Sequence, residues 1–565
     1  MATLYVRTGG TGNGSSAEPF GTLNAAASVA RAGDVVIIGD GIYDLKAGQG
    51  IDRAQRKVVL GTPNVTWRAE TPGGAIFRGD WSPALLRDGQ MPNAKNYYGG
   101  GMYSAIITLD GPGVTLDGVT VERVSCEGIG VHGGHAGMAV LNCSTYWTGG
   151  SGINAKTGGR ADGPAKWAGG LWIEGNTIIL ASTLSLDPVW RNSTSGRPDP
   201  AIVAMPVGNV IDAVIKNNRV GYCFGEGIAL AKNARGAAVI GNVVNDTRHV
   251  ELYVLHSEDA DLFDNVCYAT SGHAVYRKPP GNSGNGFAVR DERSDDMGPS
   301  DNIRVWANLF VGTDGGINIA SRYGKEPGYI YLGYNTIVGG SDKALVNLAS
   351  GRGVFENNVV ERASASGPVA VADASGFKVR NNVWSHEPPP ALRTGAKVGP
   401  VGLVKTDRQL VTVGMESDFP PTYAEFLARV SDNFTLADYR PTAVSAALNA
   451  AVASDATPEA LRSRTYAGAL STGPVGPPPP DDDPPPDPPD GPEPPLEAPD
   501  WDALIEQAAA VGVQLAVQAE ANRGRWALLE ELREAEAVFS LALDQATAEL
   551  GELLLKLDEY KQAAG

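Results

Sequence analysis

Four short apolar segments each lead to a side chain that can take part in acid, base or hydrogen-bonding chemistry. The segments align on their first apolar residue, which is Ile228, Leu252, Phe287 or Ile317. Four positions further on, the aligned segments carry Lys232, His256, Asp291 and Ser321. If the segments are neighbouring strands in this register, these polar side chains form a stack along one edge of a sheet.

Carboxylates around this stack would suit hydrolysis of a glycosidic bond. The candidates on neighbouring segments are Glu226, Glu251, Asp291 and Glu292. Glycoside hydrolysis uses two carboxyl groups about 5–5.5 Å apart for retention, or about 6.5–9.5 Å apart for inversion. Equivalent positions on adjacent strands are about 4.8 Å apart, so either spacing is within reach. We take Glu226, Glu251 and Asp291 as candidate catalytic carboxylates.

A second reaction, β-elimination from a uronic acid, would use bases of the same stack. It needs a base such as Lys232 or His256, and a cation that neutralises the substrate carboxylate. The acidic run SEDADLFDN could supply calcium ligands, although it lacks the pattern of a calcium-binding loop. The sequence therefore predicts no metal site and no cofactor, and leaves calcium as an open alternative.

Candidate substrate-binding residues lie beside the stack and in irregular stretches of the chain. They are two arginines, Arg290 and Arg322, and four aromatic residues, Trp167, Trp190, Tyr97 and Tyr98. Loops on a rigid scaffold are common binding positions, and aromatic faces there can stack on sugar rings. The structural alternative is that the aromatic residues fill loop interiors and that the polar stack is a water-facing edge with weak ion pairs.

A repeat indicates which elements would hold these residues. One asparagine recurs, each time before a short apolar strand, as Asn142, Asn176, Asn218, Asn242, Asn265, Asn308, Asn335, Asn358 and Asn382. The shortest spacings are 23 or 24 residues, and the longer gaps fit one repeat plus an inserted loop. A coil of short parallel strands gives this periodicity. We expect the asparagines to be architectural, because Asn tolerates the left-handed backbone of a sharp corner.

With this repeat, the chain resembles a right-handed parallel β-helix of the pectate-lyase-like superfamily over residues 1–470. The N-terminal stretch is similar to the capping unit of such proteins, with a strand at Tyr5-Val6, a helix over 22–32 and a first rung over 34–43. Residues 432–451 are similar to the terminal segment, although AVSAALNAA replaces its usual small-residue motif. The resemblance implies an all-β solenoid but no single activity, because this fold carries many chemistries.

Four regions follow one another along the chain. The capped solenoid covers 1–404, and a closing region covers 405–473. Residues 474–500 are dominated by proline and acidic residues, a composition that gives an extended spacer. Residues 501–565 place apolar residues at three- and four-residue spacing, which is typical of an α-helical coiled coil. A turn at 522–524 would instead give a helical hairpin, so oligomerisation and docking both stay open.

Charge and composition exclude several partners. The net charge is −18 and the isoelectric point is about 4.9, so the phosphates of nucleic acids or anionic membranes would repel the chain. No stretch approaches the length of a membrane span. The cysteines lack the spacing of a zinc site, and we expect buried free thiols at Cys126, Cys143, Cys223 and Cys267.

The first residues show no basic segment followed by an apolar stretch, so we expect no export through a signal peptide. Together with the solenoid, spacer and helical end, this resembles virion components such as phage tailspikes, tail fibres or head fibres, which bind host surface polysaccharide. That resemblance implies a homotrimer in the virion, attached to virion proteins through the C-terminal helices. One alternative is a polysaccharide lyase or glycoside hydrolase acting on acidic polysaccharide. Another is a bacterial surface protein whose C-terminal helices dock onto a partner.

Overall fold

The structure is a computed structural model that describes residues 2–81, 104–157, 167–186, 203–269, 285–291, 298–312, 315–321, 326–339, 345–362, 374–399 and 422–425. Two compact units divide the chain, residues 1–486 and 487–565. Every described residue belongs to the first unit. The predicted spacer over 474–500 and helical segment over 501–565 lie outside the described residues, as does all of the closing region except 422–425.

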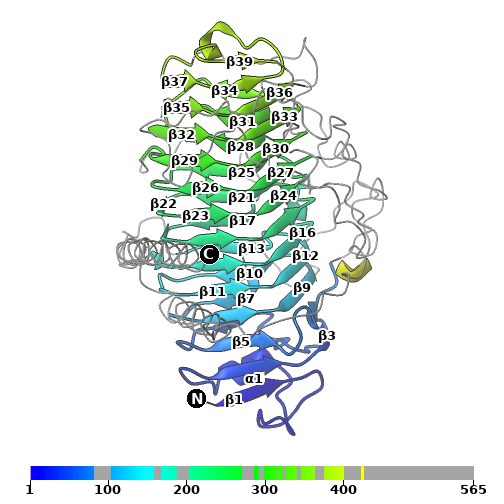
Figure 1. Cartoon of the computed structure of the whole chain (residues 1–565). Coiled ribbons are helices and arrows are strands. Elements are labelled where there is room, and N and C mark those ends of the chain that lie inside the picture. The colour runs from blue at the N-terminus through cyan, green and yellow to red at the C-terminus, as the bar shows by residue number, and fades with distance from the viewer. Residues whose placement is uncertain are drawn as a thin grey trace, which may run out of the picture. The chain divides into compact units, whose positions relative to one another are not determined.

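Three long parallel sheets build the first unit, and the chain visits them in turn (Figure 1). Among the described residues, the first sheet has thirteen strands: β1 (Thr3–Val6), β2 (Val35–Ile38), β5 (Thr66–Ala69), β8 (Thr115–Asp117), β11 (Ala139–Leu141), β15 (Trp172–Glu174), β19 (Val214–Lys216), β23 (Ala238–Ile240), β26 (Asp261–Phe263), β29 (Ile303–Trp306), β32 (Tyr329–Gly333), β35 (Arg352–Glu356) and β37 (Phe377–Arg380). Over the same part of the chain, the second sheet has ten: β4 (Val58–Leu60), β7 (Ala105–Leu109), β10 (Glu127–Val131), β13 (Ile153–Lys156), β17 (Val203–Gly208), β21 (Glu226–Ala231), β25 (Val250–Leu255), β28 (Asn285–Val289), β31 (Gly315–Ile319) and β34 (Val346–Leu348).

The third sheet also has thirteen strands in the part of the chain that the structure describes: β3 (Gly41–Asp44), β6 (Ala75–Arg78), β9 (Val119–Val124), β12 (Ser144–Thr148), β16 (Thr177–Ile179), β20 (Arg219–Gly221), β24 (Val243–Asn245), β27 (Val266–Tyr268), β30 (Leu309–Val311), β33 (Thr336–Gly339), β36 (Val359–Arg362), β38 (Val383–Trp384) and β39 (Lys397–Val398). A small sheet adds β14 (Ala168–Gly169), β18 (Val210–Ile211) and β22 (Ala234–Arg235). The strands stack in order from the N-terminal end, so the first unit is the predicted right-handed parallel β-helix (Figure 1).

The core is a stack of apolar side chains that the sequence alignment placed correctly. Ile228 pairs with Leu252, Leu252 with Phe287, and Phe287 with Ile317, on consecutive strands of the second sheet. All four are buried in one hydrophobic core. The predicted register is therefore confirmed. Strands this short cannot bury their apolar faces alone, so each rung is stabilised by its neighbours.

An asparagine ladder fixes the corner between the first and third sheets, as the repeat predicted. It runs through Asn176, Asn218, Asn242, Asn265, Asn308, Asn335, Asn358 and Asn382. Each Oδ1 accepts from the ladder residue of the preceding rung. For example, Asn242 Oδ1 accepts from the backbone N–H and from Nδ2 of Asn218, both at 2.9 Å. These bonds confirm the architectural role.

The ladder begins one rung later than predicted. Cys143, and not Asn142, has the equivalent position, because the Cys143 N–H donates to Asn176 Oδ1 at 2.9 Å. Asn142 lies one residue earlier, has φ of 51°, and donates to Asp117 Oδ1 at 2.9 Å. The left-handed residue is therefore the one before the ladder position, as at Asn217 with φ of 54°. The sequence was misleading here because Asn suits both positions.

The N-terminal cap contains a helix that is shorter than the predicted 22–32. Helix α1 spans Leu23–Ala27, and the Thr22 side chain caps it by accepting from the Ala25 N–H at 3.2 Å. Short 3₁₀ helices follow at Thr183–Leu186 and Pro390–Leu392. No helix within the described ranges is long and apolar enough to cross a membrane. All four cysteines are free and buried, as expected.

Candidate functional site

The second sheet is the part of the solenoid bordered by long connections. The described residues stop at 81, 186 and 269, and resume at or just before β7, β17 and β28 of this sheet. Lys232, His256, Asp291 and Ser321 follow the ends of the four consecutive strands β21, β25, β28 and β31. The sequence alignment therefore placed the stack at the correct strand ends. It could not give the direction in which each side chain points.

His256 and Asp291 point into the protein and are held by hydrogen bonds. Their side chains are 1% and 0% exposed. Asp291 accepts from the His256 N–H at 2.9 Å, from the Ser300 N–H at 2.7 Å and from Ser300 Oγ at 2.6 Å. His256 Nδ1 lies 2.9 Å from the Gly298 carbonyl oxygen, which can only accept, so Nδ1 carries a proton. This geometry favours a structural role at the strand ends.

Glu251 also faces the interior, because of its position at the start of β25. In register it lies between Gly227 and Gly286. A Cβ atom added at Gly227 would lie 2.5 Å from the Val244 side chain, and one added at Gly286 would lie 2.6 Å from the Phe310 side chain. Val244 and Phe310 belong to strands of the third sheet. This position therefore points into the corner between the sheets, and Glu251 there is fully buried.

Glu226 and Lys232 lie at opposite ends of β21, and both act electrostatically on Lys156 of β13, which the sequence analysis did not single out. Asn154 Nδ2 donates to Glu127 Oε1 at 2.5 Å. The charges of Lys232, Glu226 and Glu127 all act on Lys156 and influence its pKa. We call Glu127, Asn154, Lys156, Glu226 and Lys232 the carboxylate–lysine cluster.

Glu127 is the buried acid of this cluster. It begins β10 and is 1% exposed, and its Oε2 has no hydrogen-bond partner among the described residues. Burial raises the pKa of the Glu127 carboxyl to about 7, although the hydrogen bond from Asn154 and the charge of Lys156 oppose this. A carboxyl group with such a pKa is part protonated at neutral pH, so it can donate or accept a proton.

Lys156 is the accessible base of the cluster. It ends β13, where its side chain is exposed and its neighbour in register is Gly208. Protein atoms still crowd the ammonium group, and this loss of water, together with repulsion from Lys232, lowers the pKa of Lys156. A lowered pKa increases the fraction of neutral amine, which is the form that removes a proton.

The two glutamates of the cluster begin strands of the same sheet. Glu127 on β10 and Glu226 on β21 begin strands that are separated by β13 and β17. Three strand spacings put their backbones roughly 14 Å apart. Glycosidase carboxyl groups need to stand within about 9.5 Å of each other. Glutamate side chains can extend across part of this distance, and the register puts the backbones of Glu127 and Lys156 roughly 17 Å apart, so both predicted reactions stay open here.

A buried apolar patch lies beside the cluster on the second sheet. It consists of Val203, Ala229, Ala231, Val250, Tyr253, Leu255 and Ala288. The Tyr253 hydroxyl donates to the Arg290 carbonyl oxygen at 3.2 Å. Arg290 is half-buried, and its Nε has no hydrogen-bond partner among the described residues. Arg290 is therefore placed at the margin of this patch, beside the predicted stack.

The other predicted binding residues are either engaged or lie outside the described residues. Trp167 is buried, and the Arg235 guanidinium stands over its ring at 5.1 Å. Arg235 also pairs with Glu258 at 3.3 Å. Outside the described residues lie Arg322, Trp190, Tyr97 and Tyr98.

The acidic run that could bind calcium contacts the next rung. Asp261 makes a bidentate pair with Arg304, at 2.6 and 2.7 Å. Asp259 Oδ1 accepts from Asn302 Nδ2 at 2.7 Å. Within the described ranges, no three His, Cys, Asp or Glu side chains are grouped so that they could hold a metal ion. Whether calcium takes part stays an open prediction.

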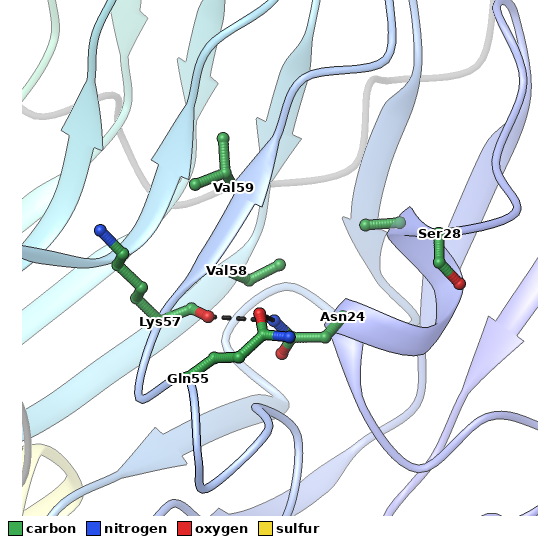
Figure 2. A pocket seen from close by; sticks show the side chains of 7 residues that line it. Asn24, Ser28, Gln55, Lys57, Val58 and Val59 are labelled. Atoms are coloured by element: carbon green, nitrogen blue, oxygen red, sulfur yellow. Dashed lines mark hydrogen bonds between the residues drawn. The ribbon is translucent and has the colours of Figure 1, made fainter.

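A hollow of about 480 Å³ lies beside the N-terminal cap (Figure 2). Its lining residues are Asn24, Ala27, Ser28, Gln55, Lys57, Val58 and Val59. Asn24 Nδ2 donates to Gln55 Oε1 at 2.8 Å and to the Lys57 carbonyl oxygen at 3.0 Å (Figure 2). Lys57 is the ionisable residue in this lining, so the hollow does not offer an acid and a base together.

Comparisons with known proteins add a resemblance at the level of the solenoid. No family model and no curated protein matches the chain. The pectate lyase Pel9A structure is 15% identical and covers 83% of this chain and 96% of its own, with a TM-score of 0.46. A rhamnogalacturonan lyase is 13% identical and covers 76% of this chain and 98% of its own, with a TM-score of 0.40. PfbA, a surface adhesin of Streptococcus pneumoniae, is 10% identical and covers 64% of this chain and 80% of its own, with a TM-score of 0.38. Because all three scores are low, the fold assignment rests on strand order and register.

Proposed function

We propose that the second sheet binds an acidic polysaccharide at the carboxylate–lysine cluster and cleaves it by β-elimination. The observation that carries this proposal is the grouping of Glu127, Lys156 and Lys232 on one sheet of a chain whose net charge is −18. The ammonium group of a lysine can pair with a uronate carboxylate as a point charge. In an acidic protein, two neighbouring lysines mark a local site for such an anion.

In the proposed reaction, Lys232 pairs with the uronate carboxylate and thereby favours loss of the adjacent C5 proton. The neutral amine of Lys156 takes that proton as the C4–O bond breaks and a C4–C5 double bond forms. The protonated Glu127 gives its proton to the departing oxygen. Lys156 ends protonated and Glu127 ionised, so the atoms and charges balance, and water resets both groups.

Cleavage is tested by incubating the purified full chain with polyuronates and following the ultraviolet absorbance of the new double bond. We expect Glu127→Gln and Lys156→Met each to lower the rate by about 10²–10⁴-fold, as for loss of a general acid or base. Lys378→Met, on an exposed position of β37, is the matched control and should retain full activity. Binding without any product across the panel would leave adhesion as the function, and no binding would contradict the proposal.

We also propose the adhesive, virion-borne role that the remainder of the chain favours. The observation is the acidic proline-rich stretch over 474–500 followed by the heptad-like segment over 501–565. A coiled coil there would make a homotrimer and would attach the solenoid to virion proteins. Light scattering on the full chain and on a chain ending at Gly473 tests this role. We expect a trimer that becomes a monomer on truncation, whereas a monomer in both cases would favour a docking hairpin.

A further inference from the structure

A short segment beyond the last rung contacts the third sheet near the N-terminal end of the solenoid. The Tyr423 backbone N–H donates to Glu122 Oε2 at 3.2 Å, across a sequence separation of 301 residues. The Tyr423 ring lies 5.9 Å from the Tyr146 ring, between ring centroids. In Figure 1 the segment is the yellow turn beside β9 and β12. The chain therefore returns from the last rung to these early strands.

The surface that receives Tyr423 is built from paired residues. Glu122 pairs in register with Arg78 on one side and with Tyr146 on the other. Arg78 Nε donates to Glu122 Oε1, so each carboxylate oxygen of this buried glutamate has its own donor. Tyr146 is fully buried and packs edge-on against Trp147, with ring centroids 6.1 Å apart. Tyr423 therefore packs on a surface that Arg78, Glu122, Tyr146 and Trp147 already form with one another.

This surface lies on the strands that lead directly into the carboxylate–lysine cluster. β9 ends at Val124, and Glu127 begins β10 three residues later. β12 ends at Thr148, and β13 then carries Asn154 and Lys156. We call residues 122–127 and 146–154 the β9/β12 corner. In a solenoid each rung contacts only its neighbours, so a brace on two rungs acts locally.

We infer that Tyr423 and Glu122 are positioning residues, which brace the β9/β12 corner and so hold Glu127, Asn154 and Lys156 in their arrangement. The functional part of this inference rests on the proposed function. Neither residue is assigned a contact with substrate. The contact is instead expected to fix the corner backbone, and with it the bond between Asn154 and Glu127.

The test compares Tyr423→Leu with the wild type in the full chain, by hydrogen exchange of backbone amides. We expect peptides within 119–131 and 144–156 to exchange about tenfold faster, because local opening becomes easier. Tyr423→Phe keeps the ring and the backbone N–H and should restore wild-type exchange. Tyr329→Leu is the matched control, since Tyr329 is a half-buried tyrosine on β32 of the first sheet. It should leave both corner peptides unchanged.

The second readout is the pH dependence of polyuronate binding, which a purely structural role would not move. Ionisation of Glu127 adds negative charge to the cluster, so polyuronate binding should weaken as pH rises through the pKa of Glu127. We expect Tyr423→Leu to shift the midpoint of that change, and Tyr423→Phe to leave it in place. Unchanged exchange at the corner, or faster exchange along the whole solenoid, overturns the brace. Faster local exchange with an unshifted pH midpoint overturns the positioning role alone. If wild-type protein binds no polyuronate while local exchange still responds, the proposed function fails and the brace stands.

Discussion

At the residue scale, the direction of each side chain decides which candidates remain accessible for chemistry. Lys232, His256 and Asp291 lie at equivalent positions after adjacent strands, yet His256 and Asp291 are buried whereas Lys232 is half-exposed. Glu251, at the start of β25, is buried as well. Lys232 and His256 both have a left-handed backbone, with φ of 65° and 50°, so the backbone corner does not account for their different exposure. Gly298 and Ser300 hold His256 and Asp291 by hydrogen bonds, and an offset counted along the sequence does not include these later residues.

Glu127→Gln is expected to stabilise the protein above neutral pH. The pKa of Glu127 is raised by burial from 4.5 to about 7, so the unfolded chain ionises first as pH rises. Stability is therefore lost between about pH 4.5 and pH 7 and stays lower above that, by up to about 3 kcal/mol. Glutamine does not ionise, so Glu127→Gln avoids this loss of stability. The glutamine side-chain oxygen can still accept the hydrogen bond from Asn154.

Urea unfolding at pH 5 and pH 8 checks this expectation. The gain from Glu127→Gln should be larger at pH 8, and Glu258→Gln, on a partly exposed ion pair, serves as the control. Equal effects at both pH values would mean that Glu127 is already ionised in the folded protein.

Asp291→Ala is expected to act on stability first. The substitution leaves the His256 N–H and both Ser300 donors without their acceptor in a buried place. Each such loss costs about 1–3 kcal/mol. We expect a lower unfolding midpoint by circular dichroism. If the wild type cleaves polyuronate, the rate of Asp291→Ala should fall only in proportion to the fraction of the variant that is folded. A folded Asp291→Ala protein with abolished cleavage would return Asp291 to the catalytic candidates.

At the scale of elements, the repeat made most of the solenoid predictable. The 23- or 24-residue asparagine spacing and the apolar alignment gave the strands and their register, because both reflect contacts repeated on every rung. The ladder start and the helix length were predicted less well, since each depends on a single local choice. Position 143 holds cysteine, and α1 ends after Ala27.

The cluster could have been found only in part from sequence. The tripeptide Glu-Gly-Ile occurs at 127–129 and again at 226–228, which marks equivalent strand starts. That signal would have added Glu127 to the candidates. Nothing in the sequence shows that Asn154 and Lys156 approach Glu127, because their nearness depends on which strands stand side by side.

Removing one ladder residue should weaken the solenoid near its centre. Asn242→Ala deletes the side-chain bonds to Asn218 and Asn265 and to the Ile215 carbonyl oxygen. We expect a loss of about 2–4 kcal/mol in the free energy of unfolding, because several buried groups lose partners. Asn347→Ala, a half-exposed asparagine on β34, is the control and should cost under about 1 kcal/mol. Similar midpoints in urea for the two variants would contradict the ladder's contribution.

At the scale of the whole molecule, the second sheet runs along the solenoid, and several of its side chains outside the main core, such as Ala229, Tyr253 and Ala288, are buried. The ten-stranded sheet carries the acid and base on β10 and β13, and the predicted stack at the ends of later strands. The strongly acidic remainder of the chain would repel a polyanion, so the cluster lysines should decide where it binds. Recognition of substrate carboxylates by the cluster lysines is therefore the property on which the proposed function depends.

Calorimetry with one polyuronate and its carboxyl-reduced, neutral counterpart of the same length tests that claim most directly. We predict that the wild type binds the charged polymer at least about tenfold more tightly, which corresponds to about 1.4 kcal/mol, and that Lys156→Met removes most of this preference. Equal affinity for both polymers, or a preference that survives Lys156→Met, would contradict the assignment of the cluster as the site that meets an acidic polysaccharide.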